Sequence, residues 1–174
     1  MWKLTILLGA IVAISSCAGL SNTDSSFSDI PISSKIVVLK EFKIPPNTAH
    51  VTFQYGKIVN ENEMNAVNYS YTNCRFEVDN LSGNYQVVKP DTFSITSIES
   101  NSFPAMGLSV LNYYTKFYLH STKSPNVLYM KCAQLDGPTD FDYPTISQIR
   151  QALGGYINIV LPEDAGKTDD KKKK

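Results

Sequence analysis

Apolar and polar residues alternate in short runs along most of the chain, and this period of two is typical of β-strands that bury one face. In residues 74–79, Cys74, Phe76 and Val78 fall on one face and charged residues fall on the other. Turn-forming residues separate these runs, so the pattern indicates successive strands. The predicted strands cover residues 35–42, 49–55, 74–79, 91–98, 112–121, 127–133 and 156–161.

One predicted strand, over residues 91–98, breaks the alternation. Its apolar residues Phe93, Ile95 and Ile98 cannot share one face unless the pattern slips by one position. A β-bulge, which inserts one extra residue into a strand, explains such a slip. In the neighbouring strand over 127–133, Leu128, Met130 and Cys132 are predicted to share a face. The predicted loops include residues 60–73 and 101–107.

A single short helix is predicted near the C-terminus. Thr145 and Gln148 have the spacing of a capping box, in which each side chain satisfies a backbone N–H of the first turn. Ile146, Ile149 and Leu153 follow at helical spacing. One of the two glycines that come next is expected to end the helix.

These elements predict a mainly β fold. The strands follow one another through turns rather than helices, so we expect a single antiparallel β-sandwich-like domain with one short helix near the C-terminus. An open or distorted barrel is the alternative. The globular domain is predicted over residues 35–163, after a Ser-rich flexible tether over 17–34 and before a disordered Lys-rich tail over 164–174.

The N-terminus has the features of an export signal. Lys3 precedes the apolar run 4–14, and two small residues precede Cys17. The run is shorter than the roughly 20 residues that cross a bilayer. Residues 14–17 (ISSC) resemble the lipobox of bacterial lipoproteins, which implies a signal peptide over 1–16 and fatty acyl chains, palmitate among them, on Cys17.

Acyl chains on Cys17 would anchor the chain to a membrane. Each buried CH₂ contributes about 0.8 kcal/mol, and more than one chain gives stable anchoring. Ala18 occupies the position where the lipoprotein family carries Asp for retention at the inner membrane. The resemblance therefore implies a lipid-anchored protein on the periplasmic face of the outer membrane. An ordinary cleaved signal followed by an unmodified Cys17 is the alternative.

The two remaining cysteines, Cys74 and Cys132, form an even pair in an exported chain. Such a pair in an oxidising compartment predicts a disulfide, with two free thiols as the alternative. Both cysteines lie on the apolar phase of their predicted strands. We therefore expect the disulfide to bridge the core of the sandwich.

Four segments of the body together are similar to small uncharacterised proteobacterial envelope lipoproteins. These segments are residues 44–54, 74–78 (CRFEV), 90–93 (PDTF) and 149–154 (IRQALG). The resemblance covers most of residues 35–161. It implies an envelope location and brings no activity to this chain.

Charge and motifs exclude several functions. The formal net charge is zero, so nothing favours nucleic acid as a partner. The two histidines, His50 and His120, fall on the polar phase of their strands without a Cys or carboxylate at ligand spacing, and we interpret them as surface residues. Cys74 lies on the apolar phase of its predicted strand, and an apolar environment makes a thiol unreactive. No catalytic or phosphate-binding motif is present, so we expect no enzyme and no cofactor.

A cluster of acidic residues in one predicted loop is a candidate calcium site. Asp136, Asp140 and Asp142 lie in one predicted loop and could offer oxygen ligands. Their spacing differs from that of an EF-hand, and Asp is common in turns for its own hydrogen bonds. We therefore expect no metal.

The polar face of the strand over 112–121 is the candidate interaction surface. Tyr114 and Tyr118 lie on it, with Tyr129 on the neighbouring strand, and tyrosine is favoured at interfaces. Alternatively these tyrosines belong to the core. The first hypothesis is a non-catalytic lipid-anchored subunit that binds another envelope protein. The alternatives are a module that binds a glycan or a host enzyme through this face, and a hydrolase built on His50 or His120.

Overall fold

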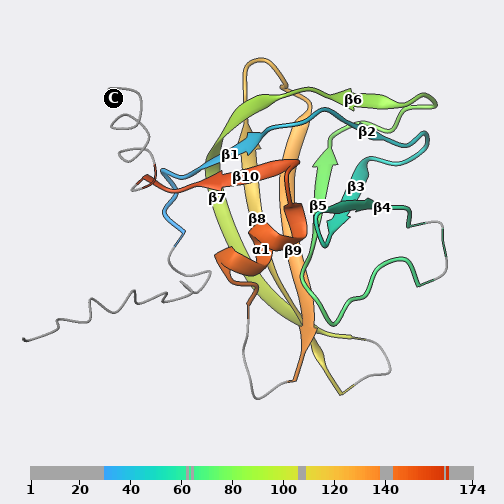
Figure 1. Ribbon diagram of the computed structural model, residues 1–174, viewed down its shortest axis with the longest axis vertical. Coiled ribbons are helices and arrows are strands. Elements are labelled where there is room, and N and C mark those ends of the chain that lie inside the picture. The colour runs from blue at the N-terminus through green and yellow to red at the C-terminus, as the bar shows by residue number, and fades with distance from the viewer. Residues whose placement is uncertain are drawn as a thin grey trace, which may run out of the picture.

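The computed structural model describes residues 30–61, 63, 65–105, 109–137, 143–162 and 164. Within these residues the chain forms ten strands and the helix α1 (Figure 1). The elements are β1 (Lys35–Val38), β2 (Phe42–Ile44), β3 (His50–Gln54), β4 (Lys57–Val59), β5 (Asn73–Val78), β6 (Gln86–Val88), β7 (Asp91–Pro104), β8 (Leu111–His120), β9 (Val127–Asp136), α1 (Ile146–Leu153) and β10 (Ile157–Val160).

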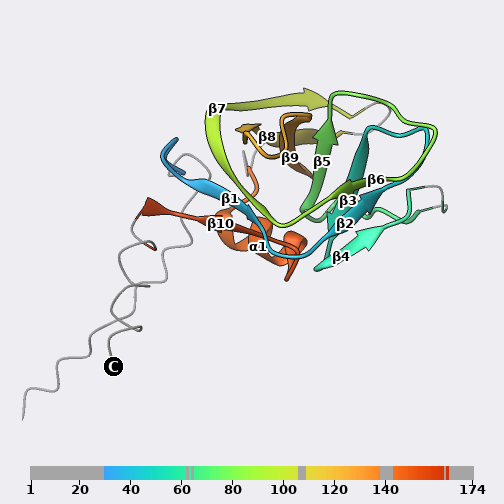
Figure 2. The same ribbon diagram turned by 90° about the horizontal axis from the view of Figure 1, so that it is seen from above.

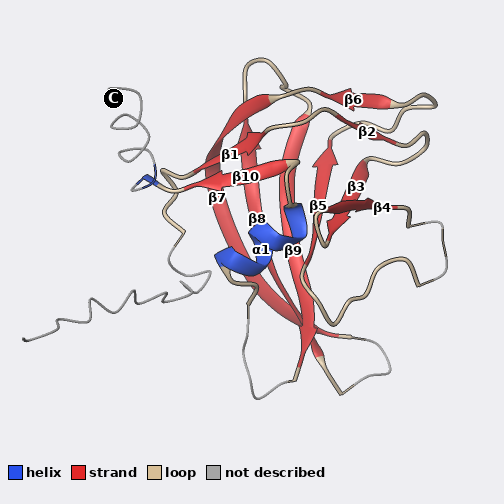
Figure 3. Cartoon of the chain, in the orientation of Figure 1, coloured by secondary structure: helices blue, strands red, loops and turns tan. Residues whose placement is uncertain are grey.

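Eight strands form one antiparallel sheet in the order β10-β1-β7-β8-β9-β5-β3-β4, and β2 pairs with β6 in a small second sheet. Figure 2 shows that the large sheet curls, with α1 at its open side between β10 and the β3–β4 hairpin. Figure 3 shows the strands of both sheets in red and α1 in blue. The predicted mainly β antiparallel domain is confirmed, and its facing layers belong to one curled sheet.

Aromatic rings fill the interior of the curled sheet. Phe53, Phe76, Phe93 and Phe117 come from four different strands and are fully buried. Phe42 of β2 packs edge-on against Phe53 and Phe76, with ring centroids 5.1 and 5.3 Å apart. Burying each such side chain contributes about 2–3 kcal/mol. The small sheet therefore covers one end of the core, at the top of Figure 1.

The helix α1 begins and ends as the sequence indicates. Thr145 and Gln148 form the predicted capping box, and Gly154 is the C-cap. The apolar stripe of α1 faces the core, which explains why an eight-residue helix is stable here. Its buried residues are Ile146, Ile149, Ala152 and Leu153.

The turn between β3 and β4 packs directly on the C-terminal end of α1. Tyr55 and Gly56 have φ values of 53° and 73°, which together make a type I′ turn. The Gly56 N–H donates to the Ala152 carbonyl at 3.0 Å. A Cβ on Gly154 would overlap the Gly56 Cα and lie 3.1 Å from its carbonyl oxygen. Two backbones thus touch where the helix closes the sheet.

β7 is longer than predicted. It continues from the expected end at residue 98 to Pro104, because β8 pairs with it as far as the Pro104–Leu111 partners. The predicted loop over 101–107 is therefore wrong for residues 101–104. The predicted bulge is confirmed. Ile95 pairs with Leu119, and Ser97 pairs with Tyr118, the residue just before Leu119, so β7 has one extra residue between the two pairs.

A second bulge corrects the predicted inner face of β9. Val78 of β5 pairs with Val127, whereas the preceding residue of β5 pairs with Tyr129, so Leu128 is skipped. As a result Val127 is buried and Leu128 is 41% exposed. The prediction that Leu128 shares a face with Met130 is wrong because sequence alternation alone does not reveal this shift.

The packed body extends slightly beyond the predicted limits. Ile30 belongs to the core and Ser34 is buried, so the body includes residues from 30 onward that were assigned to the tether. At the other end, Asp164 accepts a hydrogen bond from Arg150 at 2.9 Å. Residues 1–29 and 165–174, which contain the predicted signal and most of the tether and tail, lie outside the described residues.

Candidate functional site

The outer surface of β8 carries two of the tyrosines that the sequence singled out. Along β8, buried Tyr113 and Phe117 alternate with partly exposed Tyr114 and Tyr118, as expected for a strand with one face on the core. Tyr129 lies beside them on β9, and its ring centroid is 6.0 Å from that of Tyr118. The three tyrosines are therefore brought together on a partly exposed surface rather than in the core.

Other side chains from β7, β8 and β9 complete this surface, which we call the outer tyrosine face. It combines aromatic rings with charged groups, and Phe103 at the end of β7 is 44% exposed. The outer tyrosine face consists of Glu99, Phe103, Tyr114, Lys116, Tyr118, Tyr129 and Lys131.

Each lysine of the outer tyrosine face lies over two aromatic rings. The Lys116 Nζ is 4.7 Å from the ring centroid of Tyr129 and 5.4 Å from that of Tyr118. The Lys131 Nζ is 4.2 Å from the centroid of Tyr114 and 5.6 Å from that of Phe103. Such cation–π contacts contribute about 0.5–1 kcal/mol each at exposed sites. They also hold the ammonium groups at fixed positions on the sheet.

Glu99 accepts hydrogen bonds from two tyrosine hydroxyls of this face. Its two carboxylate oxygens accept hydrogen bonds of 3.0 Å from the hydroxyls of Tyr114 and Tyr118, and the Lys116 Nζ is 3.9 Å away. The hydrogen bonds from Tyr114 and Tyr118 lower the pKa of Glu99. Burial and the bond to Glu99 raise the pKa of Tyr114. The carboxylate is thus ionised and the phenol protonated at neutral pH, which keeps both rings in place.

Three cations lie in a row across neighbouring strands. Lys116 of β8 is directly opposite Lys131 of β9, which is directly opposite Arg75 of β5. Like charges in directly opposite positions destabilise a sheet. Burial, followed by the charges of Lys116 and Arg75, lowers the pKa of Lys131. We call these three residues the cation row.

His50 has a carboxylate partner, contrary to the expectation from sequence. The chain after β4 folds back so that the Glu61 Oε2 lies 3.2 Å from the His50 Nε2 and 3.3 Å from the Arg75 Nη2. Thr52 donates to the other oxygen of Glu61. The carboxylate is the common partner of His50 and Thr52. This arrangement therefore differs from a catalytic triad, in which the imidazole contacts the hydroxyl.

The Glu61 cluster predicts a loss of stability in acid. The hydrogen bond from His50, with those from Thr52 and the charge of Arg75, outweighs burial and lowers the pKa of Glu61 from 4.5 to about 2. A depressed pKa in the folded state stabilises the fold above about pH 5, and this contribution is lost as the pH falls toward 2. We expect it to be about 2 kcal/mol for this partly exposed carboxylate.

The test compares Glu61→Gln with wild type by urea denaturation between pH 7 and pH 3. The variant should be less stable at pH 7 and should lose less stability on acidification. Glu41→Gln, at an exposed position, is the matched control and should follow wild type. Parallel pH profiles for Glu61→Gln and wild type would contradict the assignment.

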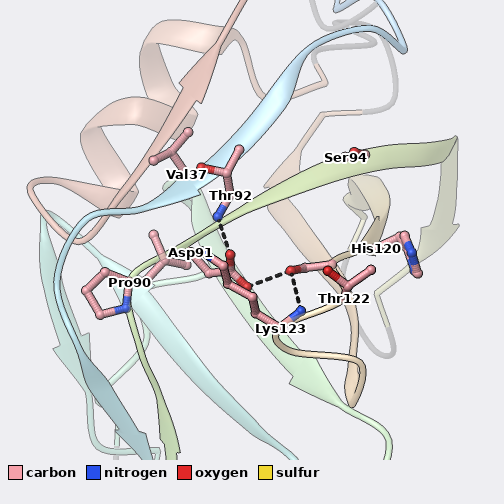
Figure 4. A pocket seen from close by; sticks show the side chains of 10 residues that line it. Val37, Pro90, Asp91, Thr92, Ser94, His120, Thr122 and Lys123 are labelled. Carbon is pink, nitrogen blue, oxygen red and sulfur yellow. Dashed lines mark hydrogen bonds between the residues drawn. The ribbon is translucent and has the colours of Figure 1, made fainter.

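His120 lies at the rim of a separate hollow of about 550 Å³ between β1, the start of β7 and the β8–β9 turn (Figure 4). Asp91 at its centre accepts hydrogen bonds from the hydroxyls of Ser121 at 2.7 Å and Ser124 at 2.9 Å. The His120 ring points away from Asp91 in Figure 4. Asp91 therefore fixes the β8–β9 turn and does not form an acid–base pair with His120.

The predicted disulfide is present between Cys74 and Cys132, with an S–S distance of 2.08 Å. The two residues are directly opposite each other on β5 and β9, and both are fully buried. The disulfide therefore joins neighbouring strands of one sheet. The expectation that it would bridge two layers of a sandwich is wrong, because β5 and β9 pair directly.

Several sequence predictions fall outside the described residues. These include the lipidation site Cys17, and Asp140 and Asp142 of the candidate calcium cluster. Asp136 is described, and its Oδ1 accepts the Gly137 N–H at 2.7 Å, which is ordinary turn chemistry. Among the described residues, no three His, Cys, Asp or Glu side chains gather as a metal site would require. In the same part of the chain, no helix is long and apolar enough to cross a membrane.

Comparison with protein-family models, curated proteins and solved structures finds no match to this chain. The proposed function therefore rests on the residues of this chain alone. Sequence analysis found the three tyrosines but missed Glu99, the cation row and Glu61. The outward phase of Arg75, Lys116 and Lys131 is visible in the sequence, whereas the strand register that aligns them is not.

Proposed function

We propose that this chain is a non-catalytic, lipid-anchored protein on the periplasmic face of the outer membrane. It binds an acidic surface of another envelope protein through the outer tyrosine face and the cation row. The signal-like N-terminus and the lipobox-like residues 14–17 support export and anchoring. A buried disulfide fits an oxidising compartment.

The observation that carries the proposal is the cation row. Lys116, Lys131 and Arg75 are held directly opposite one another, an arrangement that costs stability in the free protein. Residues that oppose folding are expected where a function requires them. Carboxylates of a partner placed over Lys131 would remove this repulsion on binding. Binding would thus be favoured by the relief of electrostatic repulsion that the unbound protein retains within the cation row.

The rings beside the row favour a protein as the partner. Tyrosine, phenylalanine and arginine are enriched in protein interfaces because they bury a large area and keep polar groups available. The row is short, and it ends at Glu99 on one side and at Glu61 on the other. Nucleic acid binding relies on many phosphate contacts from a basic surface, which a chain of zero net charge does not offer. A short acidic segment of a protein fits better.

Site-specific photo-cross-linking in intact cells tests this proposal. Benzoylphenylalanine at Phe103 or Tyr129 should give one reproducible adduct, and the linked partner peptide should contain Asp or Glu close to the link. The matched control is Val87 of β6, which is similarly exposed at 46% but lies in the small sheet. Equal adducts from all three positions, or none from Phe103 and Tyr129, would contradict the proposal.

A further inference from the structure

A polar hollow at the closure of the curled sheet is separate from the outer tyrosine face. It measures about 370 Å³ and lies between the β3–β4 turn, the segment 70–72, the end of β9 and α1. Two exposed tyrosines, Tyr55 and Tyr71, line this hollow. Tyr55 is 52% exposed, Tyr71 is 57% exposed, and their ring centroids are 5.7 Å apart.

Tyr55 occupies a backbone position that does not suit it. It is the first central residue of the type I′ turn, with a φ of 53°, where Asn followed by Gly is the preferred pair. A bulky residue at positive φ carries strain, and such strain is typical of binding sites. The turn already has the glycine, Gly56, at its second position. The tyrosine is therefore best explained by what its exposed ring contacts in a complex.

The backbone of Tyr71 is hydrogen-bonded to the buried side-chain amide of Gln54. The Gln54 Nε2 donates to the carbonyls of Asn68 at 2.7 Å and Tyr71 at 3.2 Å, and its Oε1 accepts the Asn68 N–H at 3.0 Å. The Asn73 Nδ2 donates to the same Tyr71 carbonyl at 3.3 Å. These bonds fix the backbone of Tyr71 while its ring stays exposed. The two rings are thus presented by ordered segments, which lowers the entropic cost of binding.

The lining between the rings and α1 consists mostly of uncharged hydrogen-bonding groups. Gln148 and Gln151 contribute amides from α1, and Thr72 contributes a hydroxyl. The Oε1 of Gln148 accepts the Thr145 N–H of the capping box at 2.8 Å, which fixes the orientation of that amide. Among the described lining residues, Asp136 is the single charged group. The site offers nothing that would bind an anion.

We propose that this hollow binds a neutral oligosaccharide. The apolar C–H faces of a sugar ring would pack on Tyr55 and Tyr71. Its hydroxyls would exchange hydrogen bonds with Gln148, Gln151 and Asp136, since amides and carboxylates can each bond to two groups. Aromatic surfaces with a few fixed polar groups are the usual composition of a small-molecule site. This proposal does not depend on the outer tyrosine face.

Titration of the full-length protein in detergent with maltotriose and with N,N′,N″-triacetylchitotriose tests the site, using calorimetry and saturation-transfer NMR. At least one of the two sugars should bind. Tyr55→Asn should weaken that binding at least tenfold without lowering the Tm, because it creates the preferred Asn-Gly turn. Tyr71→Ala should weaken it similarly. Tyr85→Ala, at an exposed tyrosine in another part of the surface, is the matched control and should bind as wild type does.

Three results would overturn the proposal. They are failure of both sugars to bind at millimolar concentration, equal binding by Tyr55→Asn and wild type, and tighter binding of an anionic sugar such as triglucuronic acid. A fall in the Tm of Tyr55→Asn would refute the assigned strain. In that event Tyr71→Ala, which leaves the turn intact, would still decide whether the hollow binds the sugar.

Discussion

Reduction of the Cys74–Cys132 disulfide is expected to lower the free energy of unfolding by about 4 kcal/mol. The disulfide closes a loop with a sequence separation of 58, and in the chain-entropy model a loop of this length restricts the unfolded chain by that amount. It also joins β5 to β9 in the middle of the large sheet. The effect should therefore reach the whole domain rather than a local segment.

Thermal unfolding with and without dithiothreitol measures this contribution. The Tm of wild type should fall by about 10 °C in the reductant, given the usual 2–4 °C per kcal/mol for a domain of this size. The double variant Cys74→Ala, Cys132→Ala serves as the control and should show no response to the reductant. A wild-type Tm that is the same in both buffers would contradict the expected stabilisation.

Gly154→Ala is expected to destabilise the protein by about 3 kcal/mol or more. Gly154 has a φ of 56°, which a residue with a Cβ adopts only with strain. The new methyl group would also overlap the backbone of Gly56. Relief of this overlap must move the β3–β4 turn away from α1 and break the bond from the Gly56 N–H to Ala152. The closure of the sheet would then loosen.

Urea denaturation compares this variant with Gly83→Ala, the matched control. Gly83 lies in the turn before β6, and a Cβ there would meet open space. The control should unfold within about 0.5 kcal/mol of wild type, as surface substitutions usually do. If Gly154→Ala unfolded as close to wild type as Gly83→Ala does, the backbone contact between the turn and α1 would not be a structural requirement.

The sequence correctly predicted the features that are determined by residues close together in the chain. The capping box of Thr145 and Gln148 requires only their spacing, and it is present as predicted. The alternation in residues 112–121 correctly separates the outer Tyr114 and Tyr118 from buried Phe117. The bulge in β7 was visible because the apolar residues changed phase. Each of these signals lies within about ten residues of chain.

Features that depend on long-range pairing could not be predicted in this way. The cation row exists because β8, β9 and β5 pair in one particular register, and a shift of one residue would face these side chains to the core. Glu61 comes from a polar stretch whose path over β3 is set by tertiary contacts. Leu128 is exposed because it is the extra residue of a bulge in β9, which only the pairing with β5 reveals. The proposed interaction surface therefore forms only in the folded sheet.

The most direct test of the proposed interaction is the yield of the photo-adduct from benzoylphenylalanine at Phe103 when Lys131 is replaced by glutamate. Lys131→Glu should reduce the yield at least tenfold while leaving the Tm close to that of wild type. The loss of repulsion from Lys116 and Arg75 offsets the loss of the cation–π contacts with Tyr114 and Phe103. Lys43→Glu, at an exposed lysine of β2, should leave the yield unchanged. An undiminished adduct in the Lys131→Glu protein would show that the cation row does not bind the partner.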